Sequence, residues 1–359
     1  MNKRNARILF LLILLSIVGG VLTFIFMPRE PLLLKRATKI TDTHAWENRW
    51  TAYHWINDRK ILFRGKQPQD PTLTWLAFFK WDTVTRQQTY LKGLTHLTQD
   101  SYNEKHSDIN ISPDGTFLMW PTDEGGLIVA TLQGQQTFGE QIFSFERGYG
   151  GRAAWMGDSA HLIEYAMDPD RDRIAYGTIF DVKTGKPSQH LAVVPDFMFD
   201  TVATNNRLLA RDRSGEDAGE RVTDRLEIRE AEIGKVKQPA HKYTILLPFK
   251  GEIGEEQFSS DGSHIVWSLV QKSGNLPPLY AWLHRLIPAF NPPHMSKISL
   301  WVSRINGSQM HEIGYVPVRW NTKIDTPDLE DEIKFLSWTP NGQRLSFIYK
   351  NALYTIPVD

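Results

Sequence analysis

A short turn between apolar residues recurs six times along the chain and constrains the fold more than any other feature. Each copy contains an Asp or Asn: Asp58, Asp114, Asp158, Asn205, Asp261 and Asn341. A large apolar residue stands three positions before each of them, and another stands four positions after. The copies follow at intervals of 56, 44, 47, 56 and 80 residues. Such a period predicts a series of similar supersecondary units.

The residues around the turns predict β-structure. Asp-Gly and Asn-Gly, as at Asp114–Gly115 and Asn341–Gly342, tolerate positive φ and form tight hairpins. The flanking segments, such as 264–267, are apolar, aromatic and β-branched. Each unit therefore holds about four strands in roughly 45–55 residues, the size of a β-propeller blade. We expect an all-β, six-bladed propeller; the alternative is a seven-bladed ring with one blade hidden in the 80-residue interval.

One copy of the turn has a familiar sequence. Ser112–Gly115 reads Ser-Pro-Asp-Gly, with Leu118 shortly after it, and this resembles the WD-like repeats of TolB-type β-propellers. The copy at 260–262 lacks the proline, and the copy at 339–342 reads Thr-Pro-Asn-Gly. The resemblance covers most of residues 28–359, by spacing more than by identity. It implies six blades but no single activity, because such repeats occur in scaffold proteins, in sensors and as lids of larger peptidases.

The two ends of the repeat region are expected to meet. The last unit predicts three strands, at 333–338, 344–349 and 352–356. Lys39–Thr41 stands before its repeat turn in the same way as His96–Thr98 stands before the next one, which suggests an outer strand in both places. We therefore expect residues near 36–41 to complete the last unit. This pairing would close the ring and shield its edges.

The N-terminal segment predicts a membrane anchor. Residues 8–27 carry no charge, and at ~1.5 Å per residue they span about 30 Å as a helix, the thickness of a bilayer core. We expect residues 1–27 to be a short basic tail and a transmembrane signal anchor; a cleaved signal peptide is the alternative. The short charged tail favours a cytoplasmic N-terminus, which would place the propeller of residues 28–359 on the external or periplasmic side of the cytoplasmic membrane.

Composition excludes several classes of function. The chain has 41 Lys and Arg against 41 Asp and Glu, so no net positive charge favours binding to nucleic acid. The absence of cysteine excludes disulfides, thiolate metal sites and a cysteine nucleophile. There is no Gly-x-Ser-x-Gly, His-Glu-x-x-His or Walker motif. We therefore expect no cofactor and no catalytic residues, and we favour binding over catalysis.

Charged segments recur at one place in the units, between the second and third predicted strands. They are residues 66–70, 123–124, 168–173 and 211–221. In a propeller these loops share one face around the channel mouth, and loops on a rigid scaffold often bind partners. The candidate partner-binding residues are Asp168, Asp170, Asp172, Arg213 and Glu216. A solvent-facing loop without a partner is the alternative at each position.

The alternating acids at 168–172 have the spacing of a calcium loop. Arg173 stands where such a loop needs Gly, and Ile179 stands where it needs Glu. We therefore expect no metal site at this position.

An apolar insertion at about 276–295 differs from the charged loops. Its apolar residues have helical spacing, and they include Tyr280, Trp282, Leu283 and Leu286. We expect an interfacial helix that lies on the membrane surface or docks a protein partner. A lid packed against the propeller is the alternative.

These features together predict a membrane-anchored β-propeller that serves as a binding or scaffold module in the cell envelope, with a protein partner. One alternative is a propeller enzyme, a hydrolase or lyase, with its site at the channel mouth. A second alternative is a purely structural subunit of an envelope complex.

Overall fold

A computed structural model describes most of the chain after residue 31. The described residues are 32–43, 53–65, 77–101, 109–121, 127–138, 152–168, 173–192, 201–211, 222–233, 241–271, 295–321, 326–327 and 332–358. The expected anchor at 8–27 and most of the insertion at 276–295 lie outside them. Within the described ranges, no helix is long and apolar enough to cross a membrane.

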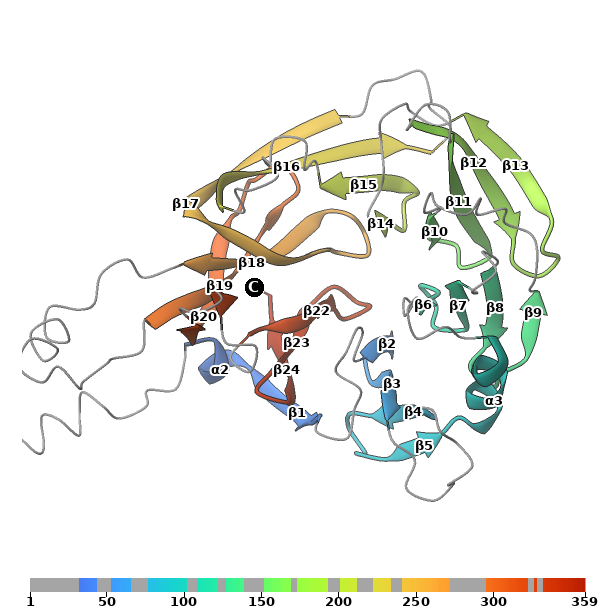
Figure 1. The fold of residues 1–359 in the computed structure, drawn as a ribbon, viewed down its shortest axis with the longest axis horizontal. Coiled ribbons are helices and arrows are strands. Elements are labelled where there is room, and N and C mark those ends of the chain that lie inside the picture. Colours follow the sequence, from blue (N-terminus) through green and yellow to red (C-terminus); the bar gives the residue numbers. More distant parts are fainter. Residues whose placement is uncertain are drawn as a thin grey trace, which may run out of the picture.

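The described elements are nearly all antiparallel strands, arranged as a ring of sheets around a central axis (Figure 1). Sheet 1 contains β2 (Tyr53–Asn57), β3 (Lys60–Gly65), β4 (Ala77–Asp82) and β5 (Gln88–Tyr90). Sheet 2 contains β6 (Asn110–Ile111), β7 (Phe117–Pro121), β8 (Leu127–Thr131) and β9 (Gln136–Phe138). Sheet 3 contains β10 (Arg152–Trp155), β11 (His161–Asp168), β12 (Arg173–Asp181) and β13 (Pro187–Ala192).

Two further sheets complete the ring. The long sheet contains β14 (Thr201–Val202), β15 (Arg207–Arg211), β16 (Val222–Glu232), β17 (His241–Phe258), β18 (His264–Gln271), β19 (Met295–Arg304), β20 (His311–Asn321) and β21 (Thr326–Pro327). The closing sheet contains β22 (Lys334–Trp338), β23 (Arg344–Tyr349), β24 (Ala352–Pro357) and β1 (Thr38–Asp42). The prediction of an all-β fold is confirmed.

The long sheet consists of two units joined by one continuous strand. The first part of β17 pairs with β16 up to Glu252, and its last part, from Glu252 to Phe258, pairs with β18. The strand therefore leaves the outer edge of one unit and becomes the inner strand of the next. Elsewhere in the described chain a separate connection links the outer strand of one unit to the inner strand of the next.

The ring closes through the N-terminal strand, as expected from the sequence. Thr38 pairs with Thr355 and Asp42 with Ala352, so β1 adds to the outer edge of β24. The comparison with His96–Thr98 was wrong, however, because those residues lie in helix α3 (Lys92–Ser101), and the outer strand of sheet 1 is β5. The leucines at 91, 94 and 97 are spaced for a helix, and all three pack in the apolar cluster between sheets 1 and 2.

A short helix, α2 (Leu32–Arg36), precedes β1 and packs against β20. Leu33 is fully buried there, and Arg36 Nη1 donates a hydrogen bond to the Ile313 carbonyl at 3.0 Å. Gly314 makes this approach possible, since a Cβ at that position would lie 2.8 Å from the Leu33 Cα atom. The N-terminal segment is therefore fixed to the ring before β1 begins.

Apolar clusters fill the junctions between neighbouring four-stranded units. Tyr53 and Ile348 belong to the cluster between sheet 1 and the closing sheet, and Met119 and Leu162 to the one between sheets 2 and 3. The residues four positions after the repeat Asp or Asn have no exposed surface in any copy: Leu62, Leu118, Leu162, Leu209, Ile265 and Leu345. The repeat therefore supplies the core, as its spacing indicates.

The repeat turns also contact one another around the ring. Hydrogen bonds join successive turns, among them Asp114 N to Ser159 Oγ (3.0 Å), Thr204 N to the Ser260 carbonyl (2.8 Å), Ser260 Oγ to the Pro340 carbonyl (3.4 Å) and Asn341 N to Asp58 Oδ1 (2.9 Å). Gly157 N donates to Asn206 Oδ1 at 3.4 Å, and Gly115 packs against the Ile56 carbonyl. These contacts place all six turns in one closed circle, here called the turn face.

Tryptophans add a second set of bonds between units. Trp155 Nε1 donates to the Asn110 carbonyl, and Trp338 Nε1 donates to the Gln257 carbonyl, both at 3.1 Å. Both acceptors stand four positions before the repeat Asp of the preceding unit. Trp55 Nε1 reaches the equivalent carbonyl, that of Ser337, through the Ser346 hydroxyl, at 2.8 Å and 3.1 Å.

Candidate functional site

The strand order supports the predicted position of the charged loops. Residues 66–70, 123–124, 168–173 and 211–221 all connect the second strand of a unit to its third, and the insertion connects β18 to β19. Because neighbouring strands are antiparallel, the strand ends that these connections join lie on the side opposite the turn face. This side is called the loop face below.

The individual residues predicted for binding are mostly beyond the described ranges. Asp168 ends β11, where it pairs in register with Arg173. The other candidates lie outside the described residues: Asp170, Asp172, Arg213, Glu216, Tyr280, Trp282, Leu283 and Leu286. Their roles in binding therefore stay predictions.

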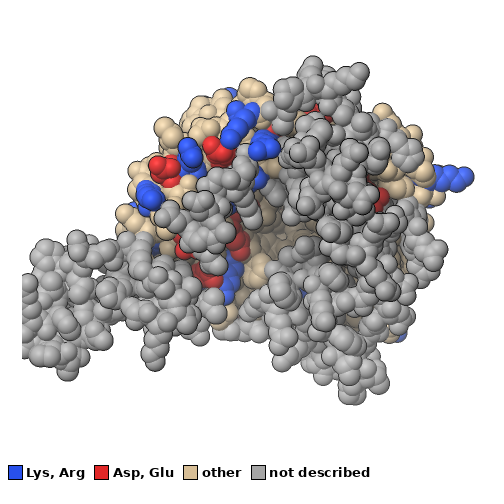
Figure 2. All heavy atoms as spheres, turned by 45° about the horizontal axis from the view of Figure 1, so that its top comes forward, with Lys and Arg blue, Asp and Glu red and all other residues tan. Residues whose placement is uncertain are grey.

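Charges of both signs alternate on β16 and the first part of β17. Lys242 Nζ lies 2.7 Å from Glu227 Oε2, and Arg225 Nε lies 3.8 Å from Glu227 Oε1. Figure 2 shows blue and red side chains interleaved over the part of the molecule that holds β16 and β17. This surface has no strong field of one sign, so its described residues do not point to a highly charged ligand.

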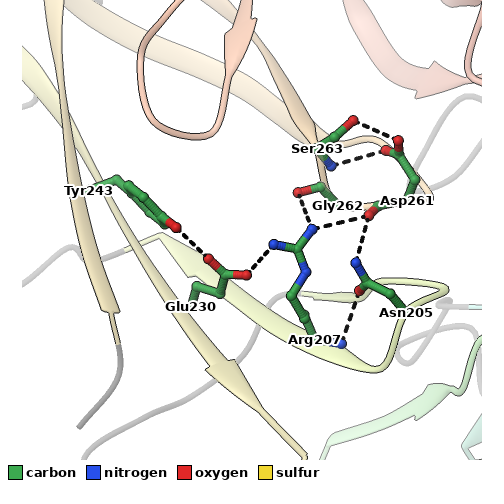
Figure 3. A network of polar contacts seen from close by, with 7 residues as sticks. All are labelled: Asn205, Arg207, Glu230, Tyr243, Asp261, Gly262 and Ser263. Carbon is green, nitrogen blue, oxygen red and sulfur yellow. Dashed lines mark hydrogen bonds and ion pairs between the residues drawn. The ribbon is translucent and has the colours of Figure 1, made fainter.

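A polar network joins the two units of the long sheet near the turn face (Figure 3). The Arg207 guanidinium forms an ion pair with Glu230, and its Nη2 reaches the Asp261 and Gly262 carbonyls at 3.5 Å. The Tyr243 hydroxyl donates to the other Glu230 oxygen at 2.6 Å. Burial, together with the Glu230 carboxylate, raises the pKa of Tyr243 to about 12, so the phenol stays protonated and remains a donor.

A second ion pair is buried nearer the loop face. Arg211, at the end of β15, binds Glu256 on β17, and their side chains are only 7% and 11% exposed. Removal of either partner of such a buried pair would leave an uncompensated charge in the interior. Both partners come from strands of the ring, so the pair holds two units of the long sheet together.

One node at the closing sheet joins three sheets. Glu255, on the inner part of β17, accepts hydrogen bonds from the N–H groups of Phe335 and Leu336 on β22, at 2.8 and 2.5 Å. The Tyr53 hydroxyl, from sheet 1, donates to the Phe335 carbonyl at 2.9 Å and contacts Ser346 Oγ at 2.7 Å. Burial raises the pKa of Glu255, although the two N–H bonds act in the opposite direction. No sequence motif pointed to this node.

Glu164 is a second buried acid that the sequence did not single out. It lies on β11, is 8% exposed and has no hydrogen bond or ion pair to any described residue. It shares a face of the strand with Leu162, which packs toward sheet 2. Burial raises its pKa to about 7.

The described residues contain one contact between a hydroxyl and an imidazole that could suggest a nucleophile. Ser263 Oγ lies 2.7 Å from His264 Nδ1 and 2.6 Å from Asp261 Oδ2. In a serine hydrolase the carboxylate orients the histidine, which then accepts the serine proton. Here the carboxylate binds the hydroxyl itself, so the single serine proton goes to Asp261 and the imidazole is not placed as its base. The three residues belong to a repeat turn and support its geometry.

Metal chemistry has no support in the described parts of the chain. Among those residues, no group of three or more His, Asp or Glu side chains is arranged to hold a metal ion. The polar contacts that the structure does show are hydrogen bonds and ion pairs between units of the ring, and they hold the ring together.

Comparisons with known proteins show no family for this chain. No family model matches the sequence, and no curated protein matches it. Similar solved structures include a chain of the mitotic checkpoint complex, with 11% identity, a TM-score of 0.47 and coverage of 92% of this chain and 96% of that one. Another is an oligogalacturonate lyase from Vibrio parahaemolyticus, with 13% identity, a TM-score of 0.41 and coverage of 89% and 91%.

A third is the C-terminal WD40 domain of Sif2, with 11% identity, a TM-score of 0.38 and coverage of 90% and 96%. Likeness at this level carries no argument about this chain. The fold itself is evident from the sheets: antiparallel four-stranded units surround a common axis, and the N-terminal strand completes the last of them. The chain therefore has the architecture of a β-propeller.

Proposed function

We propose that this chain is a six-bladed, membrane-anchored propeller of the TolB type that binds a protein partner on its loop face. Six blades follow if the long sheet counts as two, and six repeat turns in one circle support that number. The anchor is residues 8–27, and the propeller lies on the external or periplasmic side of the cytoplasmic membrane. The protein acts there as a binding or scaffold module.

The observation that carries this proposal is that polar side chains of the ring bond to other parts of the ring. On the turn face, the turns bond to one another, and Ser263 and His264 serve a turn rather than a reaction. Between the two units of the long sheet, the buried Arg211 side chain pairs with Glu256. The loop face is where the longest connections leave the ring, and a rigid ring can hold them in a fixed arrangement for a partner.

Partner binding can be tested with variants on the two faces. The full-length chain would carry Asp170→Lys, Arg213→Glu and Glu216→Lys on the loop face, and a control chain would carry Lys183→Glu and Lys186→Glu. The control lysines are exposed in the connection between β12 and β13, on the turn face. After cross-linking in native membranes, we expect the loop-face variant to lose partners that the wild type and the control retain. Equal recovery from all three chains would contradict binding at the loop face.

The anchor needs its own experiment. We expect the full-length chain to stay in the membrane fraction through alkaline carbonate washing, with its propeller accessible to protease from outside. Recovery of a soluble mature chain that begins after residue 20 would show a cleaved signal peptide instead.

A further inference from the structure

The inner strand of the closing sheet departs from regular β geometry at Phe335. Its φ is +56°, in the left-handed region that bulky residues rarely adopt, and the pairing register of β22 with β23 shifts between Lys334 and Ser337. A conformation of this kind is unfavourable for a bulky residue and persists only where surrounding contacts enforce it. Contacts around Phe335 and Leu336 must therefore hold the backbone in this unfavourable conformation.

The bulge directs two consecutive N–H groups at one carboxylate. Phe335 N binds Glu255 Oε1 and Leu336 N binds Glu255 Oε2, so each oxygen receives one donor. Successive N–H groups that converge in this way form a nest, a concave site that favours anions. The carbonyl of Phe335 is bound from the opposite side by the Tyr53 hydroxyl, which fixes the peptide that forms the nest.

Glu255 is presented to the nest by a matching irregularity in β17. The pairing of β17 with β18 shifts between Ile253 and Glu256, so Glu255 stands in a bulge of its own. Its backbone N–H is held by Ser268 Oγ at 2.9 Å, and Gly254 leaves room for that hydroxyl, since a Cβ there would lie 2.5 Å from it. Two bulges on facing inner strands thus meet through one carboxylate.

The electrostatic surroundings do not explain why this carboxylate is buried. Glu332 raises the pKa of Glu255 and Lys334 lowers it, and burial, the largest effect, raises it. Glu332 is also partly buried, and burial likewise raises its pKa, yet it has no hydrogen bond to the bulge among the described contacts. Glu255 is more deeply buried than Glu332 and, unlike Glu332, it accepts two hydrogen bonds from the backbone of the bulge.

We propose that the Phe335–Leu336 nest is a carboxylate-binding site that the chain occupies with its own Glu255, and that this internal ligand latches the closing sheet to the long sheet. The class of ligand that fits is a single carboxylate, which takes one N–H at each oxygen. A small free carboxylate such as formate should therefore bind when the Glu255 side chain is removed. The proposal concerns how the ring holds together and does not depend on the membrane anchor or on a partner.

The first test compares two isosteric variants of the full-length chain by thermal unfolding, followed by tryptophan fluorescence. Glu255→Gln keeps the shape but brings an NH2 group against one N–H donor of the nest, so we expect a lower unfolding temperature. The matched control, Glu332→Gln, removes a partly buried charge without disturbing the nest, so we expect an unchanged or higher unfolding temperature. If Glu255→Gln were as stable as the wild type, the latch would be refuted.

The second test asks whether the vacated nest binds a carboxylate. We expect sodium formate to raise the unfolding temperature of Glu255→Ala in a saturable way, relative to sodium chloride at the same ionic strength. The wild type and Glu255→Gln should show no such difference, because their nests are filled by a side chain. A formate effect of equal size in all three chains, or a folded Glu255→Ala chain that does not respond, would overturn the assignment of a binding site.

Discussion

Glu164 offers a quantitative test of how the blades pack. The residue is 8% exposed, lies between sheets 2 and 3, and has no hydrogen-bond or ion-pair partner among the described residues. Burial raises its pKa from the ordinary value of 4.5 to about 7. We expect Glu164→Gln, which has the same shape and no charge, to stabilise the fold at alkaline pH.

The size of the effect follows from the two pKa values. Below pH 4.5 the group is protonated in both the folded and the unfolded chain, so the substitution should change little. Between pH 4.5 and 7 the unfolded chain loses its proton first, so the wild type loses stability as pH rises. Above pH 7 the full cost of burying the charged carboxylate is present. The difference of 2.5 between the two pKa values corresponds to at most roughly 3 kcal/mol of unfolding free energy.

The assay is urea unfolding of both chains at pH 4.5, 6 and 8, followed by tryptophan fluorescence. Glu232→Gln, at an exposed position on β16, serves as the control. We expect the advantage of Glu164→Gln to grow with pH and to level off near pH 8. An advantage that does not change with pH would refute the reasoning, and so would one that is largest at pH 4.5.

Three other substitutions examine the contacts that close the ring. Trp155→Phe removes the donor to the Asn110 carbonyl and should cost about 1 kcal/mol beyond the effect of the smaller ring, measured by urea unfolding. Gly314→Ala places a methyl group 2.8 Å from the Leu33 Cα atom, so it should displace α2, cost roughly 1–3 kcal/mol and expose the N-terminal segment to protease; unchanged proteolysis would contradict this. Deletion of residues 28–45 removes α2 and β1, leaves the edge of β24 unpaired and should lower the unfolding temperature of the whole ring; an unchanged temperature would contradict closure by β1.

The ring can be predicted from the sequence because the residues that define each repeat are close together in the chain. An Asp or Asn in a tight turn and an apolar residue four positions later are close in the chain, and the second residue is fully buried in every copy, as at Leu62 and Leu345. The pairing of β1 with β24 was also expected, although the supporting comparison with His96–Thr98 was wrong. The apolar residues around 96–98 have helical spacing. The comparison considered only the distance of the segment from the repeat turn and did not test that spacing.

The latch could not be predicted from sequence because it is formed by two distant bulges. Residues 251–258 read as a polar strand, and nothing local indicates a positive φ at Phe335, since aromatic residues rarely adopt one. Glu164 did leave a signal, because it interrupts an otherwise apolar stretch on β11. A charged residue at a buried strand position is unusual enough to be marked as a site of perturbed pKa.

Partner contact at the loop face can be measured by site-specific photo-cross-linking in native membranes. A photoreactive residue would replace Asp170 or Glu216, which belong to the connections between loop-face strand ends, or Arg59 or Lys183 on the turn face, with one position changed per full-length chain. We expect a reproducible cross-linked protein from the loop-face positions and none from the turn-face positions. Cross-links of equal yield from the turn face, or none from either face, would contradict a binding module that presents its loop face to a partner.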